Sequence, residues 1–189
     1  MCRRAYVLVP LLGFLLGGAF VVLPGEEPGI PPQIVADYIH ALVQADRALY
    51  TTHVVERMQE LGVTVATEHW KAQRALPLPA QMLLMSGWVV EGEGMGLRIR
   101  LASLWPINKD NGPIDDFERS GLEQVAKTPN RPYTGIITQG EKRYFKALYA
   151  DRAITAACID CHNGHELSRK RNHKVNDVMG GIVVSFPLR

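Results

Sequence analysis

Five residues near the C-terminal end constrain the fold of this chain more than any other feature. The sequence CIDCH, residues 158–162, places two cysteines three positions apart and a histidine directly after the second. Covalent attachment of haem uses this spacing, because two intervening residues let both thiols reach one porphyrin edge while the next residue coordinates the iron. We therefore predict one covalently attached haem c, with Cys158 and Cys161 as its attachment points and His162 as an axial ligand of the iron.

Two other interpretations of the cysteine pair stay open at this level. A structural zinc site would need four closed ligands, and it would leave His162 unused. Its candidate ligands are Cys158, Cys161, His165 and His173. A thioredoxin-like redox pair normally opens a helix after a strand of a βαβ unit, and no such unit is visible in the surrounding sequence.

The N-terminal end of the sequence predicts a membrane segment. Residues 5–24, AYVLVPLLGFLLGGAFVVLP, carry no charged or strongly polar side chain. Twenty residues at about 1.5 Å each cross a hydrocarbon core of about 30 Å. Arg3 and Arg4 precede the segment, so they stay cytoplasmic and the rest of the chain is exported. We predict that residues 1–24 are a transmembrane anchor or a removed signal, with the haem domain on the periplasmic, extracytoplasmic side.

The remainder of the sequence predicts a linker followed by one α+β domain. Residues 25–33 contain three prolines and two glycines, which favour an extended linker. Residues 34–62 have helical apolar spacing without an interior proline or glycine, so they predict a long helix that ends at Gly62. Pro79 suits the first turn of a second helix. Alternating apolar residues then predict strands within 95–105, 131–140, 142–150 and 180–188, with a helix inserted at 114–128. The domain is predicted to cover residues 34–189.

Two charged clusters have simple explanations at this stage. Residues 168–174, SRKRNHK, carry four positive charges directly after the cysteine motif. They would neutralise the haem propionates, dock an acidic redox partner or form an ordinary solvated loop. Asp115, Asp116 and Glu118 fall in the first turn of the inserted helix, where the helix dipole favours acidic residues.

Several stretches of the chain, taken in order with the cysteine motif, resemble a known family. They are RALYTTHVV at 47–55, LPLPAQM at 76–82, RIRLASLWPINKDNGPIDDFER at 98–119 and the closing GGIVVSFPL. They resemble the extracytoplasmic c-type haem proteins with a PAS-like fold, which include sensory domains of bacterial histidine kinases and stand-alone cyanobacterial haem proteins. The resemblance extends from about Asp37 to Leu188. The turn at residues 108–111 departs from the family's Asn-Pro-x-Asn pattern because it lacks the proline.

The resemblance implies a PAS-like antiparallel sheet whose flanking helices enclose the haem, with His162 as the proximal ligand. In the stand-alone members, the opposite ligand is a cysteine on the long N-terminal helix. This sequence has no cysteine between Cys2 and Cys158. His53 falls at roughly the position of that ligand.

Helical spacing also favours His53 as the sixth ligand of the iron. At about 100° per residue, Leu42 and Leu49 lie within about 40° of His53, so we expect this stripe to face the core and the haem. His40 and Met58 each lie about 140° away from His53 on the same helix. The alternatives that stay open are a free sixth position and the side chains of His69, Met58, Met82, Met95, His165 and His173.

These features together predict a monohaem c-type cytochrome that transfers single electrons. It would act as a carrier or as an accessory subunit of a larger membrane complex, with a redox partner protein. The formal net charge of +2 is too small to indicate nucleic acid as the main partner. No nucleophile–base pair and no phosphate loop is visible, so we do not expect an enzyme. The alternative is a haem-based redox or gas sensor module that acts through a partner protein, because no output domain follows the last strand.

Overall fold

The computed structural model describes residues 29–188. The predictions of a membrane anchor or signal at residues 1–24, and of a linker at residues 25–28, lie outside the described residues. Within residues 29–188, no helix combines the length and the apolar character that a membrane span requires.

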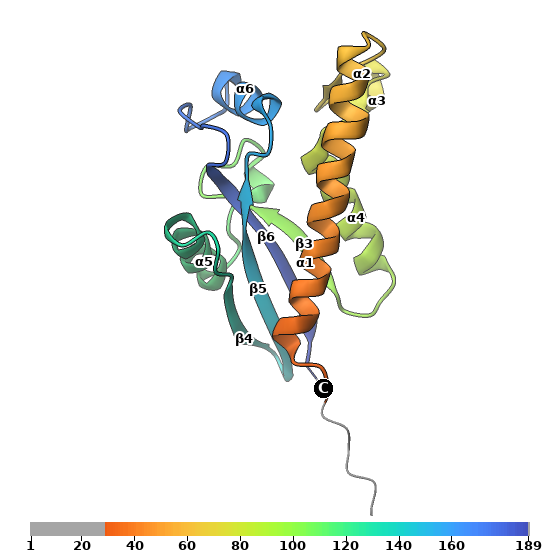
Figure 1. Cartoon of the computed structure of the whole chain (residues 1–189). Coiled ribbons are helices and arrows are strands. Elements are labelled where there is room, and N and C mark those ends of the chain that lie inside the picture. Colours follow the sequence, from red (N-terminus) through yellow and green to blue (C-terminus); the bar gives the residue numbers. More distant parts are fainter. Residues whose placement is uncertain (1–28, 189) are drawn as a thin grey trace, which may run out of the picture.

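A continuous helical segment forms the N-terminal part of the described chain (Figure 1). It consists of α1 (Pro32–Leu49), a π-helical stretch η1 (Tyr50–Glu56) and α2 (Arg57–Glu60). The segment stops before Gly62, whose φ of 65° lies in the left-handed region that favours glycine. The predicted long helix at residues 34–62 is confirmed. Its start at Pro32 lies inside the predicted linker, because proline fits the first helical turn, where no N–H donor is needed.

The face of the long helix that packs on the core differs from the one that helical spacing indicated. Thr51 and Val55, four positions apart and so on one helix face, are both buried. His53 lies between them in sequence and is exposed. Leu42 and Leu49 are 64% and 55% exposed. The prediction that the stripe of Leu42, Leu49 and His53 faces the core is therefore wrong, because a different stripe of the same helix is buried.

Four strands form one antiparallel sheet in the order β3-β6-β5-β4. They are β3 (Arg98–Ala102), β4 (Tyr133–Gln139), β5 (Lys142–Arg152) and β6 (Val178–Pro187). A tight turn at Gly140 joins β4 to β5, as the sequence predicts. All four predicted strands are confirmed. A separate two-stranded parallel pair, β1 (Ala66–Thr67) and β2 (Leu76–Pro77), flanks the short helix α3 (Trp70–Gln73).

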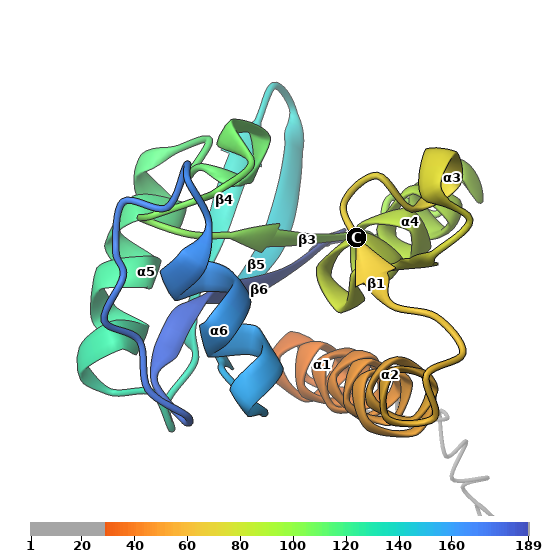
Figure 2. The same cartoon turned by 90° about the horizontal axis from the view of Figure 1, so that it is seen from above.

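Helices cover both faces of the four-stranded sheet (Figure 2). The long helix and α4 (Pro79–Gly92) pack on one face, and α5 (Asp116–Lys127) packs on the other. Side chains alternate along β6, so that Ile182 and Val184 enter the first core cluster and Val183 enters the second. A Cβ atom at Gly87 would lie 2.3 Å from the carbonyl oxygen of Ile99, so α4 packs directly against the backbone of β3. This arrangement confirms the α+β prediction.

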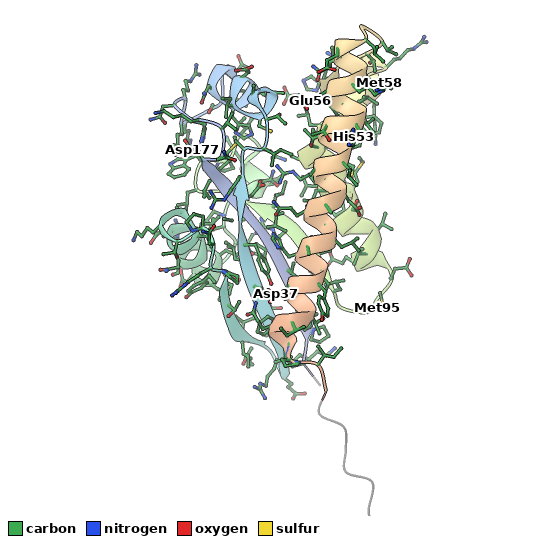
Figure 3. The ribbon with its side chains drawn as sticks, viewed as in Figure 1. Asp37, His53, Glu56, Met58, Met95 and Asp177 are labelled. Atoms are coloured by element: carbon green, nitrogen blue, oxygen red, sulfur yellow. The ribbon has the colours of Figure 1, made fainter. Side chains whose placement is uncertain are left out.

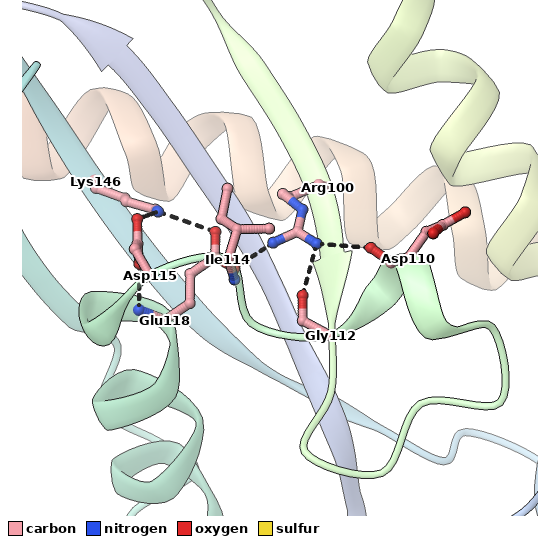
Figure 4. A network of polar contacts seen from close by, with 7 residues as sticks. All are labelled: Arg100, Asp110, Gly112, Ile114, Asp115, Glu118 and Lys146. Atoms are coloured by element: carbon pink, nitrogen blue, oxygen red, sulfur yellow. Dashed lines mark hydrogen bonds and ion pairs between the residues drawn. The ribbon is translucent and has the colours of Figure 1, made fainter.

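A buried ion-pair network joins α5 to the sheet (Figure 4). Glu118 is 0% exposed and accepts a hydrogen bond from Arg100 of β3. The Glu118 carboxylate also lies 2.9 Å from Lys146 Nζ of β5. Lys146 donates to Asp115 Oδ2 at 2.6 Å, and Asp115 Oδ1 accepts the backbone N–H of Glu118 at 2.8 Å. The helix dipole is therefore only part of the reason for these acidic residues, since two of them neutralise cations of the sheet.

Arg100 and Ser103 also hold the loop that follows β3. Arg100 Nη2 donates to the carbonyl oxygens of Asp110 at 3.1 Å and Gly112 at 2.9 Å. The backbone N–H of Ser103 donates to the Asn111 carbonyl at 2.8 Å. The loop includes a 3-10 turn, η2 (Lys109–Asn111). The turn without the family's proline is therefore fixed by hydrogen bonds from the Arg100 side chain and the Ser103 backbone.

Candidate functional site

The cysteine motif lies on a short helix, α6 (Ala156–Gly164), which the sequence analysis did not predict. The helix leaves the end of β5 and is followed by the long loop that leads into β6. The two strands are antiparallel neighbours in the sheet. Because a βαβ unit requires parallel strands, α6 does not belong to one. The thioredoxin-like interpretation therefore lacks the structural frame that it needs.

Both thiols of the motif are free. Cys158 is half-buried and Cys161 is exposed at the residue level. Burial of the sulfur raises the pKa of the Cys161 thiol, and the Glu68 carboxylate and Cys158 raise this pKa further. A redox-active cysteine normally has a lowered pKa that favours the thiolate. The electrostatics of Cys161 are those of a neutral thiol.

The four residues of the alternative zinc site are not brought together. Within residues 29–188, no group of three or more His, Cys, Asp or Glu side chains could hold a metal ion. His165 Nε2 instead lies 3.5 Å from Glu68 Oε1, and its Nδ1 accepts the backbone N–H of Leu167 at 3.1 Å. The compact zinc site is therefore not formed in this structure.

His162 is half-buried on α6. Burial lowers the pKa of its ring, and the nearby ring of His173 lowers this pKa further. The two rings are perpendicular, with centroids 6.1 Å apart. A lowered pKa keeps the imidazole neutral, which is the form that coordinates a metal.

An ion pair joins Arg47 of α1 to Asp151 near the end of β5, the strand that leads into α6. Asp151 holds the pKa of Arg47 above its ordinary value although burial acts in the opposite direction. The Arg47 Nε atom is buried and has no hydrogen-bond partner among the described residues. The two residues are 104 positions apart and follow no sequence pattern, so sequence reasoning missed them.

A cavity of about 290 Å³ lies beside the loop that follows α6. Its lining combines apolar and basic side chains, namely Pro106, Ile107, Lys109, Leu167 and Arg169. Cys158, Cys161 and His162 do not line this cavity, so the enclosure of a haem by the flanking helices stays a prediction.

The candidate distal ligands are scattered over the molecule. Figure 3 places His53 and Met58 on the upper half of the long helix, at the level of α6, and Met95 at the opposite end of the molecule. Among residues 29–188, no hydrogen bond, ion pair or ring contact joins His53 to the motif. His40 stacks on Tyr149 with centroids 3.9 Å apart, so its ring is part of the core. Only His173, among the alternatives, has its ring next to His162.

The fold and the motif helix together define a class, the small α+β proteins that carry CxxCH between the last two strands of an antiparallel sheet. The sequence model that describes the Tll0287-like family matches residues 33–187 of this chain. The chain therefore belongs to this family. The predicted membership of a haem-protein family is thereby confirmed.

One solved structure supports the same relationship at the level of fold. The crystal structure of the cyanobacterial heme-protein Tll0287 is similar to this chain with a TM-score of 0.51 and 16% sequence identity. The similarity covers 85% of this chain and 98% of that chain. At 16% sequence identity, this similarity supports the fold alone. Among curated proteins, no sequence matches this chain.

Proposed function

We propose that this chain is a monohaem c-type cytochrome in which Cys158 and Cys161 hold the porphyrin covalently and His162 is an axial ligand. The observation that carries the proposal is a complete CxxCH motif on one helix, in a member of a family whose namesake is a heme-protein. A bound haem would supply one-electron oxidation and reduction at its iron.

The residues of α6 fit this role. Positions three and four apart on a helix lie on one face, so Cys161 and His162 both lie on the face of Cys158. The two thiols are free to form thioether bonds, and burial lowers the pKa of the His162 ring, which favours the neutral form that coordinates a metal. These three side chains are the donor set that covalent haem attachment needs.

Positive charge next to the motif supports the same assignment. The Arg47 guanidinium influences the His162 ring electrostatically, and its buried Nε has no hydrogen-bond partner among the described residues. The loop after α6 adds Arg169, Lys170, Arg171 and Lys174. We infer that the four cations of this loop neutralise the propionates of the haem, since buried carboxylates require paired charge.

The cytochrome transfers electrons to a redox partner protein or within a larger membrane complex, and it has no enzymatic activity of its own. We place the haem domain on the periplasmic side, because an apolar segment follows Arg3 and Arg4. Residues 5–24 anchor it to the membrane, or they are removed and the domain is exported.

His53 remains the predicted sixth ligand. Its exposure favours a second candidate function, a sensor of redox state or of a diatomic gas that acts through a partner protein. The buried residues of the helix at this level, Thr51 and Val55, do not coordinate iron. A haem that is not bound by His53 would leave its sixth position free for a gas or for a side chain that moves.

The proposal is tested by producing the chain together with c-type haem maturation machinery and staining denaturing gels for bound haem. The wild-type chain should retain haem after denaturation, and the double variant Cys158→Ala/Cys161→Ala should lose it. Cys2→Ala is the matched control, because it removes the third cysteine without touching the motif. Haem that is retained by the double variant, or absent from the wild type, would overturn the proposal.

A further inference from the structure

The loop between α6 and β6 folds back onto the motif helix and fixes His173 there. The backbone N–H of His173 donates to Asn163 Oδ1 at 2.9 Å, and its carbonyl oxygen accepts a hydrogen bond from Asn163 Nδ2 at 2.9 Å. Asn163 directly follows His162 on α6. Both backbone polar groups of His173 are thus tied to the neighbour of the motif histidine.

The side chain of His173 is buried beside the ring of His162. The residue is 5% exposed, and the two ring planes meet at 90° with centroids 6.1 Å apart. His173 Nδ1 is buried and has no hydrogen-bond partner among the described residues. A buried polar atom without a hydrogen bond destabilises the folded state, so this nitrogen needs a partner.

The backbone contacts keep His173 beside α6, because its N–H and its carbonyl both bind Asn163 of that helix. A haem attached through Cys158 and Cys161 would be held by His162 of the same helix. His173 is therefore placed to act on the His162 ring.

We propose that His173 is a positioning residue for His162. Its buried ring restricts the rotation of the His162 imidazole. Its Nδ1, which has no partner among the described residues, would accept a hydrogen bond through one water molecule from the His162 ring nitrogen that does not hold the haem. Such a partner fixes the tautomer and raises the basicity of an axial histidine, which stabilises the oxidised iron. This inference rests on the proposed haem function.

Two substitutions at His173 distinguish the effect of its ring from the effect of its hydrogen-bond acceptor. His173→Phe keeps a planar ring and removes the acceptor, whereas His173→Gln keeps an acceptor oxygen and removes the ring. The midpoint potential of the haem and the electron paramagnetic resonance spectrum of its ferric form are measured on the haem-loaded protein. We expect a higher potential for His173→Phe and a potential close to that of the wild type for His173→Gln.

Asn172→Ala is the matched control, because Asn172 directly precedes His173 on the same loop and is exposed. It should leave the potential unchanged. The inference is overturned if both His173 variants keep the wild-type potential, or if both shift it equally, which would indicate a merely structural role. It is also overturned if His173→Phe converts the iron to a high-spin form with the haem still attached, since His173 would then be a ligand.

A measurement on the protein without haem tests this inference independently of the proposed function. If the wild type carries no covalent haem, the proposed function fails. Nitrogen-15 NMR of the histidine rings then still reports the partner of His162. We expect one ring tautomer of His162 in the wild type and a mixture of tautomers in His173→Phe. The same tautomer populations in both proteins would overturn the inference.

Discussion

Arg47 on the long helix and Asp151 on β5 form an ion pair whose side chains are only 15% and 14% exposed. Asp151 lies five positions before the start of α6, so the pair ties the long helix to the strand that leads into the motif. Because the partners come from opposite ends of the domain, the position of the motif depends on a contact between distant segments.

Removing the positive charge of this pair should destabilise the protein. Arg47→Gln leaves the Asp151 carboxylate largely buried without its partner, and we expect a loss of about 2–3 kcal/mol in the free energy of unfolding. Chemical denaturation measures the loss. Arg98→Gln is the control, because Arg98 and Glu91 form an exposed pair, and it should cost under about 1 kcal/mol. Equal losses in the two variants would contradict the prediction.

The buried network on the other face of the sheet should be equally sensitive. Glu118→Gln weakens the pairing of Arg100 and Lys146 at a site with no solvent access, and we expect a loss of about 3 kcal/mol in the free energy of unfolding. Glu123 lies on the same helix and is exposed, so Glu123→Gln serves as the control. The role of the network is refuted if the two variants unfold at the same denaturant concentration.

The same network predicts how stability responds to acid. Burial acts to raise the pKa of Asp115, but Lys146 and the Glu118 backbone N–H outweigh it and hold the pKa below its ordinary value of 3.8. A carboxylate with a lowered folded-state pKa contributes stability above its unfolded pKa, and this stability is lost as the pH falls below that value. Asp115→Asn should flatten the decline of stability below pH of about 4. Asp116→Asn, at an exposed position one residue on, should leave the decline as it is in the wild type.

His40 should produce a second pH dependence, nearer neutrality. Burial lowers the pKa of its ring below the ordinary 6.5, and the ring stacks on Tyr149. Below pH 6.5, the His40 ring is therefore protonated more readily in the unfolded chain than in the folded chain. The free energy of unfolding falls as the pH drops below that value. His40→Phe keeps the stacking and should reduce this slope in denaturation experiments between about pH 6.5 and pH 5. An unchanged slope would show that other groups cause it.

The sixth ligand distinguishes the two candidate functions. If His53 coordinates the iron, His53→Ala should convert a low-spin optical spectrum to a high-spin one and allow carbon monoxide to bind the reduced haem rapidly. Met58→Leu is the control on the same helix and should keep the wild-type spectrum. A wild-type protein that already binds carbon monoxide rapidly would contradict His53 ligation and favour the sensor.

Local signals made much of this fold predictable. Pro79 begins α4, Gly62 ends the long helix and Gly140 forms the hairpin turn, all as the sequence indicates. Each of these features depends on backbone preferences within a few residues. The antiparallel pairing of β4 with β5 followed from the tight turn that joins them. The pairing of β6 with β3 and β5 joins strands that are far apart in sequence, so no local signal indicates it.

The parts that could not be predicted depend on tertiary contacts. Helical spacing identifies an apolar stripe containing Leu42 and Leu49, but it does not decide which of two stripes packs on the sheet. The stripe that packs there contains Thr51 and Val55, and the π-helical stretch in which they lie follows no sequence rule. The place of His173 beside His162 depends on how the intervening loop folds back, which its basic composition does not reveal.

The central claim is that one haem is covalently attached through Cys158 and Cys161. The most direct measurement is the pyridine haemochrome spectrum of purified wild-type protein after extraction with acidified acetone. We expect one haem per chain that stays with the polypeptide and gives the spectrum of haem c. Haem that is extracted into the solvent, or a protein without haem, would contradict it.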